Sequence, residues 1–127
     1  MDTKANSLNW FEIPATDINR AKGFYENIFG IKMEMMEMAG MKMAGFPGEP
    51  GSGKAYGCLA QSPNHKPSLE GSVIYLNANP AMDNVLAKIE KAGGKVVMPK
   101  TKISDQIGNM AFFIDTEGNK VALHSQN

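Results

Sequence analysis

Glu12 and His124 are the two side chains in this 127-residue sequence whose types and settings indicate acid–base chemistry. Glu12 follows Trp10 in the stretch LNWFEIPA, and His124 follows Ala122 in the closing stretch DTEGNKVALH. Side chains two residues apart on a strand share a face, so Glu12 lies on the same face as Trp10, and His124 lies on the same face as Ala122. A carboxylate held beside an imidazole forms an acid–base pair or binds a polar ligand. The alternative is that Glu12 is a solvated charge at a rim and that His124 is a frayed terminal residue.

Two other patterns look like reactive sites but favour simpler interpretations. The stretch GEPGSGKA approaches a phosphate-binding loop, yet Ala55 lacks the hydroxyl that holds magnesium, and a strand-like segment follows where a helix is needed. Cys58 and His65 suggest a nucleophile and a base, but they lie on either side of a proline-containing loop with no evident orienting group. We therefore expect a flexible hairpin loop at 48–55 and a small buried thiol at Cys58.

The first half of the chain predicts one strand, one helix and three further strands. A strand is expected over 8–15, followed by a helix capped by Thr16 or Asp17, with apolar residues at helical spacing. Gly30 occupies the position where a left-handed residue ends a helix. Further strands are expected over 31–38, 41–46 and 55–61, and six methionines fall between 33 and 43. We expect these methionines mainly to fill the core or a dimer contact.

The second half repeats this order. A strand over 72–77 precedes a helix, for which Asn79 is the expected cap and Pro80 the first helical residue. Gly93 and Gly94 end that helix, and strands follow over 95–98, 109–114 and 121–124. Because each repeat has only about 63 residues, too few for an independent domain, we expect modules 8–61 and 70–124 to share one domain over 1–127.

Composition narrows the classes of partner. Thirteen basic and thirteen acidic residues give no net charge, so no basic field is available for nucleic acid or an anionic membrane surface. No apolar stretch approaches the length of a transmembrane helix, and the opening residues lack the pattern of a signal peptide. A single cysteine excludes an internal disulfide. We expect a cytoplasmic protein that binds neither nucleic acid nor membrane.

Three stretches resemble the vicinal oxygen chelate superfamily, which includes glyoxalase I, bleomycin-resistance proteins and extradiol dioxygenases. They are FEIPATDINRAKGFYENIFG, YLNANPAMDNVLAKIEKAGGKVVMPK and FFIDTEGNKVALH. The resemblance implies an α+β fold in which two βαβββ modules form one cupped mixed sheet with helices outside. It also implies that Glu12 and His124 face a common cup, and that the chain forms a homodimer, for which unpaired sheet edges give a physical reason.

The family's metal ligands are missing from the matching positions. The resemblance places them at Trp10, near Ser72, in the strand GCLAQ and at Ala122, where no histidine or carboxylate occurs. We therefore expect no divalent metal and no other cofactor. The pocket is expected to contain Trp10, Ser72, Phe112 and Ala122, with Glu12 and His124 as its acid–base residues.

Three functions remain open from the sequence. The first is a metal-independent protein that binds a small, partly apolar molecule in the cup, as bleomycin-resistance proteins do. The second is an enzyme, either a metal-dependent lyase, isomerase or dioxygenase of the glyoxalase type or one that uses Glu12 and His124 without metal. The third is a protein-interaction module that uses the methionine-rich hairpin.

Overall fold

A computed structural model describes all residues from 1 to 127. Helix α1 (Ile18–Phe29) and helix α2 (Met82–Ile89) are the only two α-helices, and neither is long and apolar enough to cross a bilayer. The strands are β1 (Trp10–Pro14), β2 (Glu34–Met38), β3 (Met41–Gly45), β4 (Tyr56–Gln61), β5 (Tyr75–Asn77), β6 (Lys95–Ser104), β7 (Gly108–Ile114) and β8 (Lys120–Ser125).

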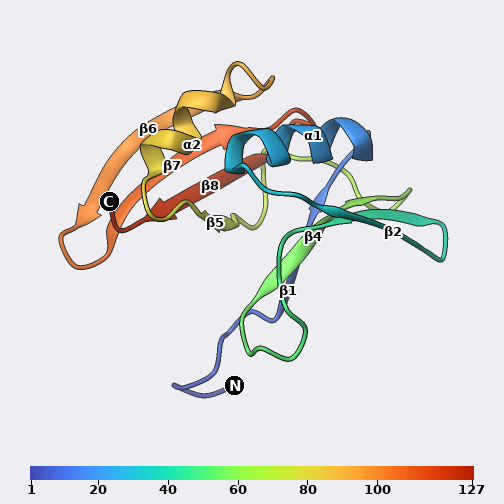
Figure 1. The fold of residues 1–127 in the computed structure, drawn as a ribbon, viewed down its shortest axis with the longest axis horizontal. Helices are drawn as coiled ribbons and strands as arrows, with labels where there is room; N and C mark the ends of the chain where they lie inside the picture. Colours follow the sequence, from blue (N-terminus) through green and yellow to red (C-terminus); the bar gives the residue numbers. More distant parts are fainter.

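The strands form two four-stranded sheets with the same internal order. The first sheet runs β1-β4-β3-β2 and the second runs β5-β8-β7-β6. In each sheet the first strand pairs in parallel with the last strand of its module, and the other pairs are antiparallel. The two helices lie side by side along one side of the molecule (Figure 1). The expected α+β fold of two βαβββ modules is confirmed, with the strands bonded within two mixed sheets.

Helix α1 begins and ends as its sequence predicts. The side chain of Asp17 accepts hydrogen bonds from the backbone N–H groups of Asn19 and Arg20, which have no partner within the helix. Gly30 ends the helix with a φ of 64°, a left-handed conformation that suits glycine, and its N–H donates to the carbonyl of Glu26.

Helix α2 starts later than the sequence predicts, and the expected cap at Asn79 is wrong. Ala81 is the N-cap residue and provides no side-chain hydrogen bond. The side-chain oxygen of Asn79 instead accepts from the backbone N–H of Gln126, and its amide donates to Asn77. The Asn79 side chain, which the sequence predicted as a helix cap, therefore binds the backbone of Gln126 near the end of the chain.

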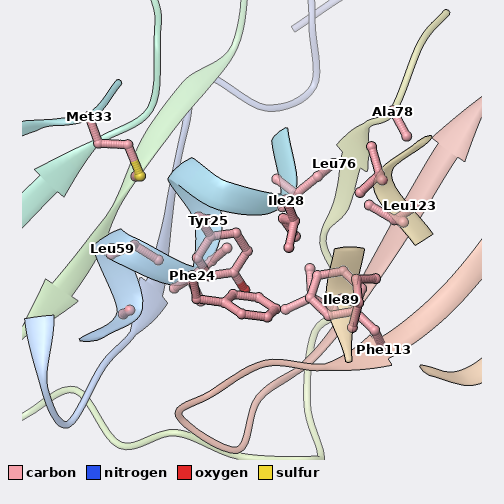
Figure 2. Close-up of a cluster of buried hydrophobic side chains, with 14 of the residues drawn as sticks. Phe24, Tyr25, Ile28, Met33, Leu59, Leu76, Ala78, Ile89, Phe113 and Leu123 are labelled. Atoms are coloured by element: carbon pink, nitrogen blue, oxygen red, sulfur yellow. The ribbon is translucent and has the colours of Figure 1, made fainter. Parts of the chain in front are cut away.

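One hydrophobic cluster joins the two modules. Figure 2 shows Phe24 and Tyr25 of helix α1 pointing toward Ile89 of helix α2 and Phe113 of strand β7. The ring centroids of Phe24 and Phe113 lie 6.0 Å apart, and all four side chains are at most 3% exposed. Apolar burial of this kind is the main favourable contribution to folding, so each module stabilises the other.

A turn from the second module is hydrogen bonded to helix α1 and to the end of β1. The buried carboxylate of Asp115 accepts from the Tyr25 hydroxyl at 2.7 Å and from the Asn119 side-chain amide at 3.0 Å. It also accepts from the backbone N–H groups of Glu117 and Asn119. The Asn119 amide donates in addition to the carbonyl of Pro14, at 2.7 Å. Asp115 and Asn119 thereby connect β1, helix α1 and the β7–β8 turn.

Glu117 joins the same turn to the N-terminus of helix α1. Its fully buried carboxylate accepts from the backbone N–H groups of Thr16 and Asp17 and binds Arg20 at 2.8 Å. Burial opposes ionisation of Glu117, but the hydrogen bonds from Arg20, Asp17 and Thr116 outweigh it and lower the pKa of this carboxyl. The turn therefore holds an ionised carboxylate at the N-terminus of helix α1, where negative charge is favoured.

The methionines of the β2–β3 hairpin are not all buried. Met33 and Met43 are buried, whereas Met35, Met36 and Met38 are 44%, 42% and 60% exposed. Strand β2 pairs only with β3 and extends away from the second module (Figure 1). The expectation that these methionines fill the core is wrong for β2 within one chain, and their place in a dimer contact stays a prediction.

We predict that Asp115→Ala lowers the free energy of unfolding by about 2–4 kcal/mol, because it leaves the buried Tyr25 hydroxyl and Asn119 amide without their acceptor. Urea denaturation followed by circular dichroism measures the change. The matched control is Asp105→Ala in the exposed β6–β7 turn, which we expect to change stability by less than about 0.5 kcal/mol. Equal effects of the two variants would contradict the role given to Asp115.

Candidate functional site

A cavity of about 850 Å³ lies between the β1 edge of the first sheet and the 72–77 segment of the second module. Eleven of its fifteen lining residues are hydrophobic. The lining comes from β1, the 72–77 segment, Phe29 at the end of helix α1, and residues that flank the β3–β4 loop. Its volume and apolar lining match those of pockets that bind small organic molecules.

Close packing of β1 on β4 positions the first wall of this cavity. Gly57 faces Phe11 in the parallel register, and a Cβ atom at Gly57 would collide with the Phe11 carbonyl oxygen. Phe11 packs against Phe46, with ring centroids 5.5 Å apart. On the opposite face of β1, Trp10 meets Tyr56 edge to face with centroids 5.1 Å apart. Glycine at this position thus brings β1 close enough to β4 for an aromatic wall to form.

Tyr75 supplies the facing wall from the second module. Its side chain is 49% exposed and packs against Phe112, with ring centroids 6.1 Å apart. Of the residues predicted for the pocket, Trp10 and Ser72 line the cavity. Phe112 contacts Tyr75 from the far side of β8, and Ala122, the register partner of both, is fully buried. Phe112 and Ala122 therefore support the wall without lining it.

Glu12 is the only acidic or basic side chain among the lining residues. It lies on the same face of β1 as Trp10, as the strand period predicts, and its carboxylate accepts from the Trp10 indole N–H at 3.2 Å. Its other oxygen lies 2.8 Å from Nε2 of His65. These hydrogen bonds, from His65 first and then from Trp10, lower the pKa of the Glu12 carboxyl.

His65 is the histidine that contacts Glu12, and sequence reasoning did not pair these two residues. Because a carboxylate only accepts, Nε2 of His65 carries the hydrogen and donates. Nδ1 of His65 lies 2.7 Å from the hydroxyl oxygen of Ser62, which also accepts from the backbone N–H of Asn64. Hydrogen bonds at both ring nitrogens therefore fix the orientation of the His65 imidazole. The only nearby sequence feature that could have indicated an oriented imidazole was Ser62, three residues before His65.

His124 has a different environment from the one expected. Its Nε2 lies 2.7 Å from the carbonyl oxygen of Ile107 and therefore donates to it. On β8 it faces Asn77 of β5 and Met110 of β7 in the register, and it is not among the residues that line the cavity. The structure thus brings Glu12 together with His65 and assigns His124 to the β6–β7 turn. The acid–base roles expected for Glu12 and His124 remain predictions.

Cys58 lies beside Glu12 on the neighbouring strand and has an unreactive thiol. It is the register partner of Glu12, is fully buried, and packs with Met43 and Ala60. Burial raises the pKa of the Cys58 thiol to about 11, and the nearby charge of Glu12 adds to this shift. The thiol stays protonated at neutral pH and is a poor nucleophile, which agrees with the buried, structural cysteine expected from the sequence.

The residues at the family's metal positions do not fit a divalent ion. The Trp10 indole offers a hydrogen-bond donor and no lone pair, and Ala122 offers no ligand atom. Nowhere in the chain do three or more histidine, cysteine, aspartate or glutamate side chains gather in a group able to hold a metal. Glu12 and His65 alone are fewer than the three or four protein ligands that such a site needs.

A smaller cleft of about 210 Å³ shares Glu12 with the main cavity. Seven of its eleven lining residues have polar side chains, among them Lys66, Glu70 and Lys120. Neither lysine forms an ion pair with Glu12, whose hydrogen-bond partners are His65 and Trp10. The carboxylate thus sits between a polar cleft on one side and an aromatic cavity on the other.

We predict that Glu12 contributes a pH-dependent increment of stability. Its pKa is lower in the folded state, so this increment is present above the unfolded pKa of about 4.3 and is lost as pH falls through the folded pKa. The free energy of unfolding of the wild type should exceed that of Glu12→Gln by up to about 1 kcal/mol above pH 5, and the difference should shrink below pH 4.

Urea denaturation at a series of pH values measures this difference. The control is Glu49→Gln in the β3–β4 loop, where the residue is exposed. A difference between wild type and Glu12→Gln that does not change from pH 6 to pH 3 would contradict the prediction.

Comparisons with known proteins agree with this architecture. The family model of the Glyoxalase/Bleomycin resistance protein/Dioxygenase superfamily matches residues 7–123. A glyoxylase-like domain-containing protein of Didymella fabae is 32% identical over 91% of this chain and 91% of its own length. CFP32 of Mycobacterium tuberculosis, a proposed glyoxylase, is 33% identical over 94% of this chain, which spans only 45% of that relative.

A solved structure extends the agreement to three dimensions. TnmS3, an antibiotic binding protein from Streptomyces sp. CB03234, superposes with a TM-score of 0.65 at 21% identity, covering 99% of this chain and 100% of its own. Likeness at this identity concerns the fold, whereas the family model and the fungal relative identify the family. The chain belongs to the Glyoxalase/Bleomycin resistance protein/Dioxygenase superfamily.

Proposed function

We propose that this chain binds a flat, partly apolar small molecule in the cavity between its two modules, without the divalent metal of its family. The observation that carries this proposal is the cavity of about 850 Å³ with Trp10, Tyr56 and Tyr75 in its walls. Aromatic walls favour flat ligands because stacked and edge-to-face contacts add to the gain from apolar burial. The antibiotic binding protein TnmS3, which has the same fold, is a precedent for such use.

An acid–base enzyme is the second candidate, because the Glu12 carboxylate and the His65 imidazole are hydrogen bonded at the cavity wall. Such a pair can move a proton on a bound molecule. The two candidates differ in one observable: a binding protein releases its ligand unchanged, whereas an enzyme releases a product. Chromatography of ligands after incubation with the protein distinguishes them.

We predict that ligand binding changes the fluorescence of Trp10, the single tryptophan of the chain, which is 38% exposed at the cavity wall. Titration with a panel of flat aromatic and polycyclic compounds should give saturable quenching or a spectral shift for those that bind. Trp10→Ala should weaken their binding, measured by calorimetry, by about tenfold or more, as for aromatic anchor residues in other sites.

The control for this substitution is Val97→Ala, at an exposed position of β6 outside the cavity lining, which should leave affinity unchanged. A panel that produces no saturable change, or binding that survives Trp10→Ala intact, would contradict the assignment of the cavity as the binding site.

A second copy of the chain is the partner we propose for the free edge of β2. All five residues of β2 are exposed and one edge of the strand is unpaired, which favours pairing with another strand. Antiparallel pairing of two β2 strands about Met36 would place Met36 opposite itself. Glu34 would then face Met38, and Glu37 would face Met35, so no like charges would be opposed.

We predict that Met36→Lys converts a homodimer into a monomer, because two lysines would face each other at the centre of the contact. Light scattering at micromolar concentration measures the mass. Ile103→Lys, on the opposite edge strand β6, is the control and should remain dimeric. A monomeric wild type, or a dimeric Met36→Lys, would contradict pairing through β2.

A further inference from the structure

The cavity between the modules combines an apolar wall with one negative charge. Glu12 is the only acidic or basic group among its lining residues, so no cation in the lining compensates this carboxylate. Hydrogen bonds from His65 and Trp10 hold the pKa of Glu12 below its usual value, so the group is ionised at neutral pH. A ligand that fills this cavity removes water from around a carboxylate, which is costly unless the ligand itself pairs with the charge.

We propose that the cavity selects a cationic ligand, a flat apolar molecule that carries a protonated amine, and that Glu12 is its counter-ion. This inference rests on the binding function proposed above and adds the charge of the ligand. An anionic ligand would be repelled by Glu12, and a neutral one would remove water from the carboxylate without adding an opposite charge.

Glu12 retains the capacity to bind such an amine. A carboxylate offers about four lone-pair directions, and the two hydrogen bonds found here use one direction on each oxygen. The side chain is 35% exposed at the cavity, so a ligand N–H can reach it. The bonds from Trp10 and His65 also fix the carboxylate in place, which lowers the entropic cost of pairing with a ligand.

The aromatic walls favour the same charge. Trp10, Tyr56 and Tyr75 line the cavity together with Glu12, and Trp10 lies within hydrogen-bond distance of the carboxylate. The faces of aromatic rings attract positive charge, so these rings favour a cation over an anion in the cavity. Aromatic rings and a single carboxylate are the combination that recognises organic ammonium groups.

The charged residues near the cavity do not remove its preference for a cationic ligand. Lys66, Lys120 and Glu70 line the smaller cleft and do not line the main cavity. Lys120 lies over the Phe112 ring, with its nitrogen 5.6 Å from the ring centroid. Glu12 accepts hydrogen bonds from His65 and Trp10, and no lysine forms an ion pair with it.

Three probes that share one ring system test the inference by calorimetry at pH 7: naphthylmethylamine, naphthalenemethanol and naphthoic acid. We expect the amine to bind at least about tenfold more tightly than the alcohol, and the acid to bind most weakly. Glu12→Gln should reduce the difference between amine and alcohol to less than about threefold. Glu12→Asp, which keeps the charge, should retain part of the preference.

Glu70→Gln is the matched control, because it removes a carboxylate from the smaller cleft only. It should leave the preference for the amine unchanged. Circular dichroism of each variant checks that the fold is intact, and Glu12→Asp provides a second variant if Glu12→Gln does not fold.

The outcomes separate this inference from the binding function on which it rests. Equal affinity for the three probes, or a preference that survives Glu12→Gln, would overturn the role of Glu12 while leaving binding in place. If none of the three probes binds, the inference fails, and the fluorescence titration with the wider panel decides the binding function separately.

Discussion

The buried carboxylate of Asp115 is the contact on which the arrangement of the two modules depends. It accepts four hydrogen bonds, from the Tyr25 hydroxyl, the Asn119 amide and two backbone N–H groups of its own turn. A buried charge of this kind is tolerated only when its hydrogen bonds are satisfied, so the turn has little freedom to move. Asn119 extends the network to the carbonyl of Pro14, the last residue of β1. The apolar cluster joins the modules, and this polar network sets how they are aligned.

The same network positions the linker that carries His65. The backbone N–H of Ser68 donates to the Asn119 side chain, and the backbone N–H of Lys120 donates to the carbonyl of Ser68. The linker is therefore tied to the start of β8, close to the end of β1. His65, three residues upstream, reaches Glu12 from this position. The residues that make the site are thus fixed by the residues that join the modules.

The chain keeps the symmetry of its family in the fold and departs from it at the site. Both sheets have the same strand order, but the aromatic lining comes mainly from the first module, and the partner of Glu12 comes from the linker. An indole and a methyl group stand where the family places metal ligands. Membership in the superfamily therefore describes the scaffold, and the chemistry follows from the residues in the cavity.

The sequence alone determined the repeat, the apolar faces of the helices, a cap for helix α1 at Thr16 or Asp17, and the shared face of Trp10 and Glu12. These features follow from periods of two and about 3.6 residues and from local capping, which act over a few residues. Tertiary structure decided the pairing of Glu12 with His65, 53 residues away, and the loss of Asn79 as a helix cap. Both depend on where the linker and the chain end are held by distant residues. No local period encodes such contacts, because they exist only after the two modules have packed together.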